Sequence, residues 1–132
     1  SRKCHDLEEN PCAALICHWT VLQRQIRIEG SVERTSQEES TEYFRTRPRG
    51  SQIGAWASTQ SASLDSYDQL VRRTTEFDQK FKGQDVPLPP FWGGYIVRPI
   101  RIEFWQGRAN RLHDRLLYER EDSGWKVTRL NP

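Results

Sequence analysis

Most helical signals of this chain lie in its middle, residues 36–83, and strand-like patterns lie on both sides of them. An apolar run and an alternating segment precede the helical part, and β-type patterns return after residue 94. Strands that flank a block of helices, rather than alternating with single helices, favour an antiparallel sheet. The sequence therefore predicts an α+β fold whose antiparallel sheet forms part of a small barrel.

The chain should begin with the end of a helix over residues 1–10, which Pro11 stops. Residues 12–19 are almost continuously apolar and predict a buried strand. Residues 22–32 alternate between apolar and polar side chains, as in a half-buried strand. Gly30 lies inside that alternation and indicates a bulge or bend.

Capping signals place the expected helices. Ser36 and Glu39 form the pattern of a capping box, and the helix that they begin should end before Pro48. A short helix is expected over residues 51–57, and a second capped helix should start at Ser66.

The rest of the chain is expected to contain a helix end, a linker and four strands. Gly83 should end the last helix, and the proline-rich residues 86–90 predict a stiff extended linker. Four strands are then expected, over residues 95–98, 100–106, 112–120 and 125–130. We expect one domain over residues 1–132, divided into a helix end with barrel strands (1–35), a helical section with the linker (36–90) and C-terminal strands (91–132).

Charge and cysteine content exclude several classes of function. The net charge of +2 comes from interspersed signs and gives no general case for nucleic-acid binding. The longest apolar run is too short to span a membrane. Three cysteines without a CxxC pair do not make a metal site, and reduced cysteines suggest a cytoplasmic protein.

One candidate site lies where the first two central helices should meet. Arg45, Arg47 and Arg49 alternate along the chain, and Ser51 opens the next helix. Helix N-termini and arginine forks both suit a phosphate group. A solvated basic turn remains the alternative.

A second candidate follows an aromatic strand. Alternation would place Arg111, His113 and Arg115 on one face of a strand. Trp105 could stack on a planar ring, although a tryptophan in the core is the commoner case. These residues suggest a site for an anionic aromatic ligand, and a solvent-facing strand is the alternative.

The chain resembles the pyridoxine (pyridoxamine) 5′-phosphate oxidase family along essentially its whole length. The motifs that carry the resemblance are SRK at 1–3, RQIRIEG at 24–30, YFRTRPRGSQIGAWAS at 43–58, QS at 60–61, WGGY at 92–95, IEFWQG at 102–107, RLHDR at 111–115 and the closing RLNP. The resemblance implies an FMN-binding split β-barrel with flanking helices and a homodimer that holds FMN at the subunit interface.

The same resemblance implies a reaction and roles for individual residues. Pyridoxine or pyridoxamine 5′-phosphate would be oxidised to pyridoxal 5′-phosphate while O2 is reduced to H2O2, and Arg111 and His113 would be the catalytic residues over the pyridine ring. FMN contacts would come from Arg2, Lys3, Gln25, Gln60, Ser61, Trp105 and Arg115. Substrate contacts would come from Tyr43, Arg47, Ser51, Arg111, Leu112 and His113.

The chain also departs from the family, which has a further N-terminal segment of roughly a third of its length. That segment carries barrel strands, the main grip on the FMN phosphate and a lysine on the substrate phosphate. The absence of methionine and the abrupt start at Ser1 favour a fragment. Three alternatives to an active oxidase remain open: a non-catalytic binder of pyridoxal phosphate or flavin, a dimerising scaffold, and an inactive fragment.

Overall fold

The computed structural model describes residues 1–132, which divide into two compact units. The helical unit comprises Ser1–His5 and Arg34–Tyr95, and the sheet unit comprises Asp6–Glu33 and Ile96–Pro132. The sheet unit is therefore discontinuous in sequence, with Arg34–Tyr95 of the helical unit inserted between its two halves. The expectation of a single domain stays a prediction. None of the helices combines the length and the apolar composition that crossing a bilayer requires.

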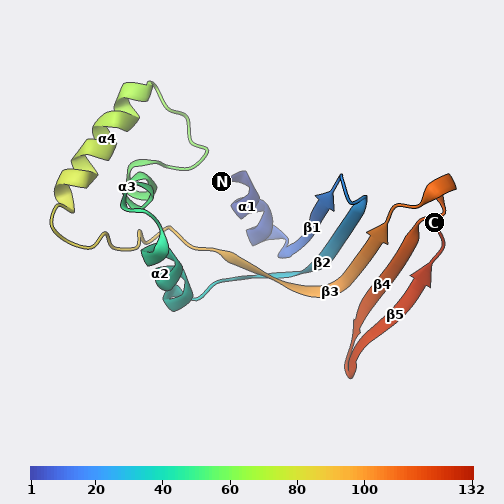
Figure 1. Ribbon diagram of the computed structural model, residues 1–132. Helices are drawn as coiled ribbons and strands as arrows, with labels where there is room; N and C mark the ends of the chain where they lie inside the picture. The colour runs from blue at the N-terminus through green and yellow to red at the C-terminus, as the bar shows by residue number, and fades with distance from the viewer. The chain divides into compact units, whose positions relative to one another are not determined.

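Five strands form one sheet in the order β1-β2-β3-β4-β5 (Figure 1). Pairs β1–β2, β3–β4 and β4–β5 are antiparallel, so the predicted α+β organisation with an antiparallel sheet is confirmed. The strands are β1 (Cys12–Trp19), β2 (Arg24–Arg34), β3 (Tyr95–Gln106), β4 (Asp114–Glu121) and β5 (Gly124–Leu130).

Two of the expected strands are in fact one. The predicted runs 95–98 and 100–106 are parts of the single strand β3, which continues through Pro99. Proline cannot donate a ladder hydrogen bond, so the sequence suggested a break. Pairing with β4 begins only at Arg101, so Pro99 lies outside that ladder and its missing N–H breaks none of its hydrogen bonds.

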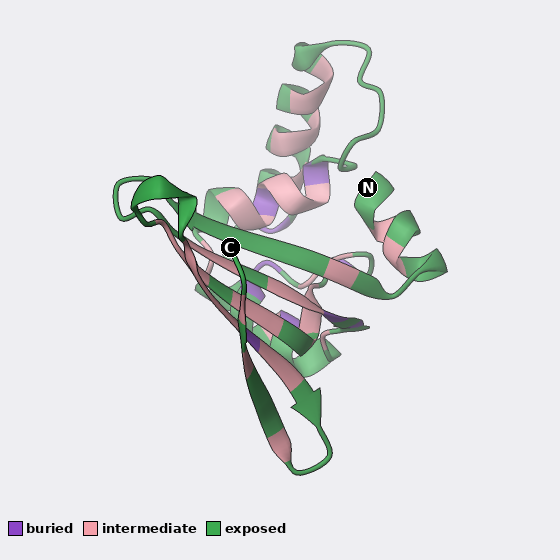
Figure 2. Ribbon diagram, turned by 90° about the vertical axis from the view of Figure 1, so that its right-hand side faces the viewer, coloured by how far each residue is buried: buried purple, intermediate pink, exposed green.

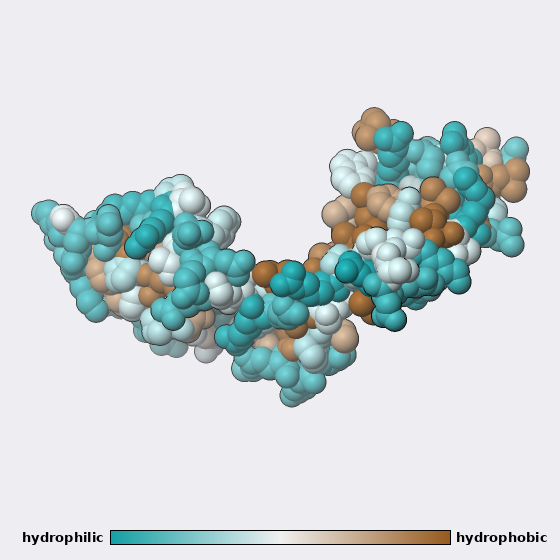
Figure 3. Space-filling model, turned by 90° about the horizontal axis from the view of Figure 1, so that it is seen from below, coloured by the Kyte–Doolittle hydropathy of each residue, from teal (hydrophilic) through white to brown (hydrophobic).

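The prediction that residues 12–19 form a buried strand is right about the strand and wrong about its burial. All of β1 except Ala13 is exposed; Ile16, for example, keeps 63% of its surface accessible. The reason is its place in the sheet, since β1 is an edge strand that pairs only with β2. Apolar side chains consequently reach the surface over the strands, as the brown atoms in Figure 3 show.

Gly30 is required by a close approach of two backbones. A Cβ at this position would lie 2.1 Å from the carbonyl oxygen of Arg98 in β3. Pairing with β1 runs through Gly30 without interruption, with Ala13 as its partner. Glycine in a strand therefore marks contact between main chains here.

The helical unit begins its helices where the capping signals predicted. α2 (Gln37–Thr46) has a complete capping box, in which Ser36 and Glu39 satisfy each other's backbone N–H groups. α4 (Tyr67–Lys80) is capped by the Ser66 hydroxyl. α3 (Arg49–Ala57) starts two residues earlier than expected, directly after Pro48. The N-terminal helix α1 (Arg2–Glu9) also agrees with its prediction.

The core of the helical unit lies between these helices and the segment that follows them. Phe44, Ile53, Phe81 and Val86 form a buried cluster, and buried positions of this unit appear purple in Figure 2. The predicted linker 86–90 has no regular secondary structure, but it buries Val86 and Pro89. This packing anchors the chain that leads to Trp92.

Candidate functional site

The predicted phosphate contacts lie at the junction of α2 and α3. Tyr43 is in the last turns of α2, Arg47 is its C-cap residue, and Ser51 is in the first turn of α3. Pro48 forces this break, because the residue before a proline is driven to extended backbone, and Arg47 has ψ 145°. The Gln52 amide donates to the carbonyl oxygen of Phe44 at 3.0 Å and ties the two helices together.

Three side chains of this junction have hydrogen-bond donors without a partner in the protein. No hydrogen bond or ion pair engages the hydroxyls of Tyr43 and Ser51 or the guanidinium of Arg47. Arg49 differs, because it donates to the carbonyl oxygens of Phe81 and Gln84 at 2.8 and 3.0 Å. Arg49 therefore uses its guanidinium to hold the fold together, whereas the guanidinium of Arg47 can still donate hydrogen bonds to a ligand.

The structure brings Tyr43 and Arg47 to one aromatic ring, that of Trp92. The guanidinium carbon of Arg47 lies 5.3 Å from the ring centre, and the Tyr43 ring stacks on the same indole at 6.1 Å. Trp92 was not among the predicted site residues. Its motif, WGGY, was a signal of family resemblance, but nothing in the residue spacing connected it with Arg47.

In the sheet unit, three predicted flavin contacts share one face of neighbouring strands. Arg101 of β3 donates to Glu29 of β2, which places these two residues on one face. Strand alternation then puts Gln25 and Trp105 on that face, and the register pairs Trp105 with Arg115 of β4. The predicted alternation of β2 side chains between two faces is therefore present in the sheet.

Arg115 is held in place by two acceptors. Its Nε donates to Glu103 Oε1 at 2.7 Å, and its Nη1 donates to the carbonyl oxygen of Asn131 at 3.1 Å. The hydrogen bond from Arg115 to Glu103, together with the charges of Arg115, Arg27 and Arg101, holds the pKa of Glu103 below its ordinary value. Burial of Glu103 acts in the opposite direction. Glu103 raises the pKa of Arg115 in return. One edge of the guanidinium, at Nη2, has no protein partner.

The prediction that Arg111 and His113 lie on a strand with Arg115 is wrong. β4 begins only at Asp114, and Arg111 ends a short 3-10 turn, η1 (Ala109–Arg111). Asn110 and Arg111 both have left-handed backbone, with φ of 57° and 61°. Backbone of this kind concentrates at functional sites, and the role of Arg111 stays a prediction.

The orientation of His113 is set by two contacts. Its Nδ1 accepts a hydrogen bond from the Arg108 backbone N–H at 3.2 Å, and its ring centre lies 4.8 Å from that of Trp105. Because Nδ1 is an acceptor, the neutral imidazole carries its proton on Nε2. The structure thus joins a predicted catalytic residue to a predicted flavin contact. Leu112, from the predicted substrate set, is 67% exposed beside it.

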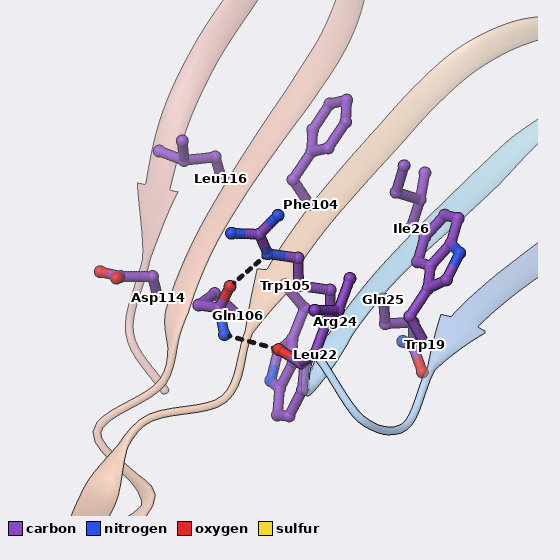
Figure 4. A pocket seen from close by; sticks show the side chains of 10 residues that line it. All are labelled: Trp19, Leu22, Arg24, Gln25, Ile26, Phe104, Trp105, Gln106, Asp114 and Leu116. Carbon is purple, nitrogen blue, oxygen red and sulfur yellow. Dashed lines mark hydrogen bonds between the residues drawn. The ribbon is translucent and has the colours of Figure 1, made fainter.

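A hollow of about 450 Å³ reaches Gln25 and Trp105, but strand alternation places most of its lining, such as Ile26 and Leu116, on the opposite face of the sheet. Gln25 and Trp105 line it together with apolar side chains such as Trp19 and Phe104 (Figure 4). Gln106 braces its wall, because its amide accepts a hydrogen bond from Arg24 and donates one to the carbonyl oxygen of Leu22. The lining offers a mainly apolar surface of the kind that binds planar ligands.

The remaining predicted flavin contacts belong to the helical unit. Arg2 and Lys3 are exposed on α1, and Gln60 and Ser61 are exposed in the loop after α3. Ser61 has positive φ, 64°, and lines a hollow of about 290 Å³ with Arg73. No side-chain hydrogen bond or ion pair joins these four residues to one another.

Metal chemistry has no candidate in this chain. No three His, Cys, Asp or Glu side chains gather closely enough to hold a metal ion. All three cysteines are free.

Comparison with known proteins gives matches along the chain. Residues 1–81 match a family model described as pyridoxamine 5′-phosphate oxidase, and residues 92–132 match one described as the pyridoxine 5′-phosphate oxidase C-terminal dimerisation region. Pyridoxine/pyridoxamine 5′-phosphate oxidase of Rubrobacter xylanophilus is 60% identical over 99% of this chain, and that of Psychromonas ingrahamii is 59% identical over all of it. The chain spans about three fifths of the length of these relatives.

Solved structures confirm the fold class. PhzG from Burkholderia lata was solved in complex with tetrahydrophenazine-1-carboxylic acid. The likeness covers all of the present chain and 64% of the PhzG chain, with a TM-score of 0.90 and 32% identity. A pyridoxamine 5′-phosphate oxidase-related, FMN-binding protein from Nostoc punctiforme matches the whole chain over 68% of its own length, with a TM-score of 0.74 and 14% identity. At this identity the likeness supports the fold alone. These likenesses confirm the predicted split-barrel type of α+β fold. With a family model that covers most of its residues, the chain belongs to the pyridoxamine 5′-phosphate oxidase family.

Proposed function

We propose that the full protein is an FMN-dependent oxidase that converts pyridoxine or pyridoxamine 5′-phosphate to pyridoxal 5′-phosphate, with O2 reduced to H2O2. The observation that carries the proposal is the α2–α3 junction, where Tyr43, Arg47 and Ser51 present unengaged donors. A phosphate monoester offers the acceptor oxygens that an arginine fork and two hydroxyls can satisfy.

Arg111 and His113 are proposed to act on the ring side of the substrate. His113 would donate through Nε2, because its Nδ1 is occupied by the Arg108 N–H. Arg111 adds a cation whose backbone is fixed by the left-handed turn. Their work is to orient the pyridine ring, since effective catalysis requires C4′ to be held close to the acceptor of its electrons.

The residues of the sheet unit fit FMN as a planar, anionic group. Gln25, Trp105 and Arg115 share one face, and the unengaged Nη2 of Arg115 is a donor for such a ligand. Arg2, Lys3, Gln60 and Ser61 complete the proposed contacts. FMN, when bound, would take up the hydride from C4′ and pass the electrons to O2. We further propose that the protein is cytoplasmic and forms a homodimer with FMN at the subunit interface; the match to a dimerisation region supports the homodimer.

The experiment is peroxide release by the full natural chain, purified with FMN and given pyridoxamine 5′-phosphate. We expect turnover, and Arg47→Ala should raise KM about ten- to a hundredfold with kcat little changed, because the phosphate lies away from the reacting carbon. Arg45→Ala is the matched control, since Arg45 is exposed on the same helix and should leave KM unchanged. Binding of the ligand without peroxide would favour the non-catalytic binder, and neither binding nor peroxide would favour a scaffold.

A second candidate substrate has one observation behind it. The PhzG neighbour was solved with an aromatic carboxylic acid, so an aromatic carboxylate is an alternative ligand for the same site. Peroxide release measured separately with pyridoxamine 5′-phosphate and with the carboxylic acid distinguishes the two substrates.

A further inference from the structure

Three aromatic and cationic side chains meet at Trp92 in the helical unit. The Tyr43 ring stacks on the indole with an interplanar angle of 23°, and the Arg47 guanidinium lies over it. On the side of the core, Phe44 meets the same ring edge-on at 5.2 Å. Trp92 thus connects two predicted phosphate contacts to a fully buried phenylalanine.

The loop that carries Trp92 is fastened on both sides of it. The Trp92 backbone N–H donates to the carbonyl oxygen of Pro89, which is fully buried, at 3.0 Å. Two residues later, the Gly94 N–H donates to the Thr35 hydroxyl at 2.9 Å, and the Thr35 N–H donates to the Gly94 carbonyl at 3.1 Å. The indole is therefore a fixed surface rather than a side chain on a free loop.

The contact with Trp92 holds Arg47 without using its hydrogen-bond donors. A cation over an aromatic ring is attracted by the electrons of the ring face, and this attraction uses no N–H donor. Arg47 has no other side-chain partner, whereas the donors of Arg49 are used by carbonyl oxygens. An arginine that is immobilised but unpaired loses less entropy when an anion arrives.

We propose that Trp92 is a positioning residue for the phosphate site: its indole preorganises Arg47 and Tyr43 so that both face a phosphate monoester with their donors free. This inference rests on the proposed function of the α2–α3 junction and adds a residue to it. In this proposal Trp92 donates no hydrogen bond to the phosphate, and it acts through Arg47 and Tyr43, the two side chains that it contacts.

The test replaces Trp92 in the full natural chain and measures the equilibrium dissociation constant for pyridoxal 5′-phosphate, together with KM and kcat. Trp92→Leu should weaken binding about three- to thirtyfold, the range expected for a lost cation–π contact, with kcat little changed. Trp92→Phe should recover part of the affinity because it keeps an aromatic face. Phe91→Leu is the matched control, since Phe91 contacts Trp56 rather than Arg47 and should leave binding unchanged.

A double-mutant cycle distinguishes positioning from general destabilisation. If Trp92 acts through Arg47, Trp92→Leu should have much less effect on binding once Arg47 is alanine. Fully additive effects, or equal losses in Trp92→Leu and Phe91→Leu, would overturn the inference. If Trp92→Leu fails to fold, Trp92→Phe carries the same cycle. Failure of the proposed function would look different, because Arg47→Ala alone would then leave phosphate-ester binding unchanged.

Discussion

The two units of the molecule present their proposed site residues in opposite states. At the α2–α3 junction of the helical unit, the hydroxyls of Tyr43 and Ser51 have no hydrogen-bond partner, and the Tyr43 ring and the Arg47 guanidinium contact only the Trp92 ring. In the sheet unit, Arg115 is paired with Glu103 and His113 accepts a hydrogen bond from the backbone. Residues of the first kind can be removed at a cost to binding alone, whereas residues of the second kind also contribute to folding.

Arg115→Ala is expected to have the largest effect on stability. It leaves the Glu103 carboxylate, whose side chain is only 16% exposed, without its main partner. The unfolding free energy should fall by about 2–3 kcal/mol, and the full protein should lose flavin on gel filtration. Chemical denaturation followed by fluorescence measures the first effect.

The control for that variant is Arg98→Ala. Arg98 pairs with Glu33 in an exposed ion pair, and exposed pairs are worth about 0–1 kcal/mol. If the two variants had the same unfolding free energy, the ion pair of Arg115 with Glu103 would stabilise the fold no more than an exposed pair does. The contrast between the two units would then be lost.

Lowering the pH should destabilise the sheet unit because Glu103 becomes protonated. Its folded pKa is lowered, so the unfolded state binds the proton more readily, and stability rises with pH in this range. The contribution is complete above the unfolded pKa of about 4.3 and is lost as pH falls through the folded value. Glu103→Gln should cost about 1 kcal/mol at pH 7 and flatten the pH dependence of unfolding between about pH 5 and 3.

Glu119→Gln provides the comparison for the acid experiment. Glu119 pairs with Arg101 but is far more exposed than Glu103, so its loss should leave the acid slope close to that of the unmodified protein. Parallel pH curves for Glu103→Gln and the unmodified protein would show that Arg115 does not hold this carboxylate.

Tyr43→Phe should have the smallest effect on stability, within about 0.5 kcal/mol, because the hydroxyl has no partner in the protein. The dissociation constant for pyridoxal 5′-phosphate should nevertheless rise about ten- to a hundredfold, the value of a hydrogen bond to a charged acceptor. Tyr67→Phe, at an exposed tyrosine outside the site, should change neither quantity. A loss of stability in Tyr43→Phe comparable to that in Arg115→Ala would remove the distinction between the two units.

Local signals in the sequence were sufficient for the helices and for the faces of the strands. The Ser36 capping box and the Pro48 break act within a few residues, so they could be predicted without knowing the fold. The exposure of β1 and the continuity of β3 through Pro99 could not, because both depend on which strands lie alongside.

The sequence names candidate site residues, which stay predictions, but it does not give their arrangement. The left-handed backbone of Arg111, which keeps it out of β4, is not encoded by residue type, and only the neighbouring Asn110 is a residue that tolerates it well. Trp92 was missed as a site residue because its contact with Arg47 crosses a long stretch of chain that no spacing rule links.

The insertion of the helical unit between β2 and β3 has a consequence for how the chain folds. The bond between Arg24 and Gln106 joins residues 82 positions apart, so the centre of the sheet forms only after a long loop has closed. Loop-closure entropy must be overcome before such distant contacts stabilise the chain, whereas the capped helices form through near neighbours. We therefore expect the inserted helices to become protected from hydrogen exchange before the pairing of β2 with β3, with the two halves of the sheet joining last.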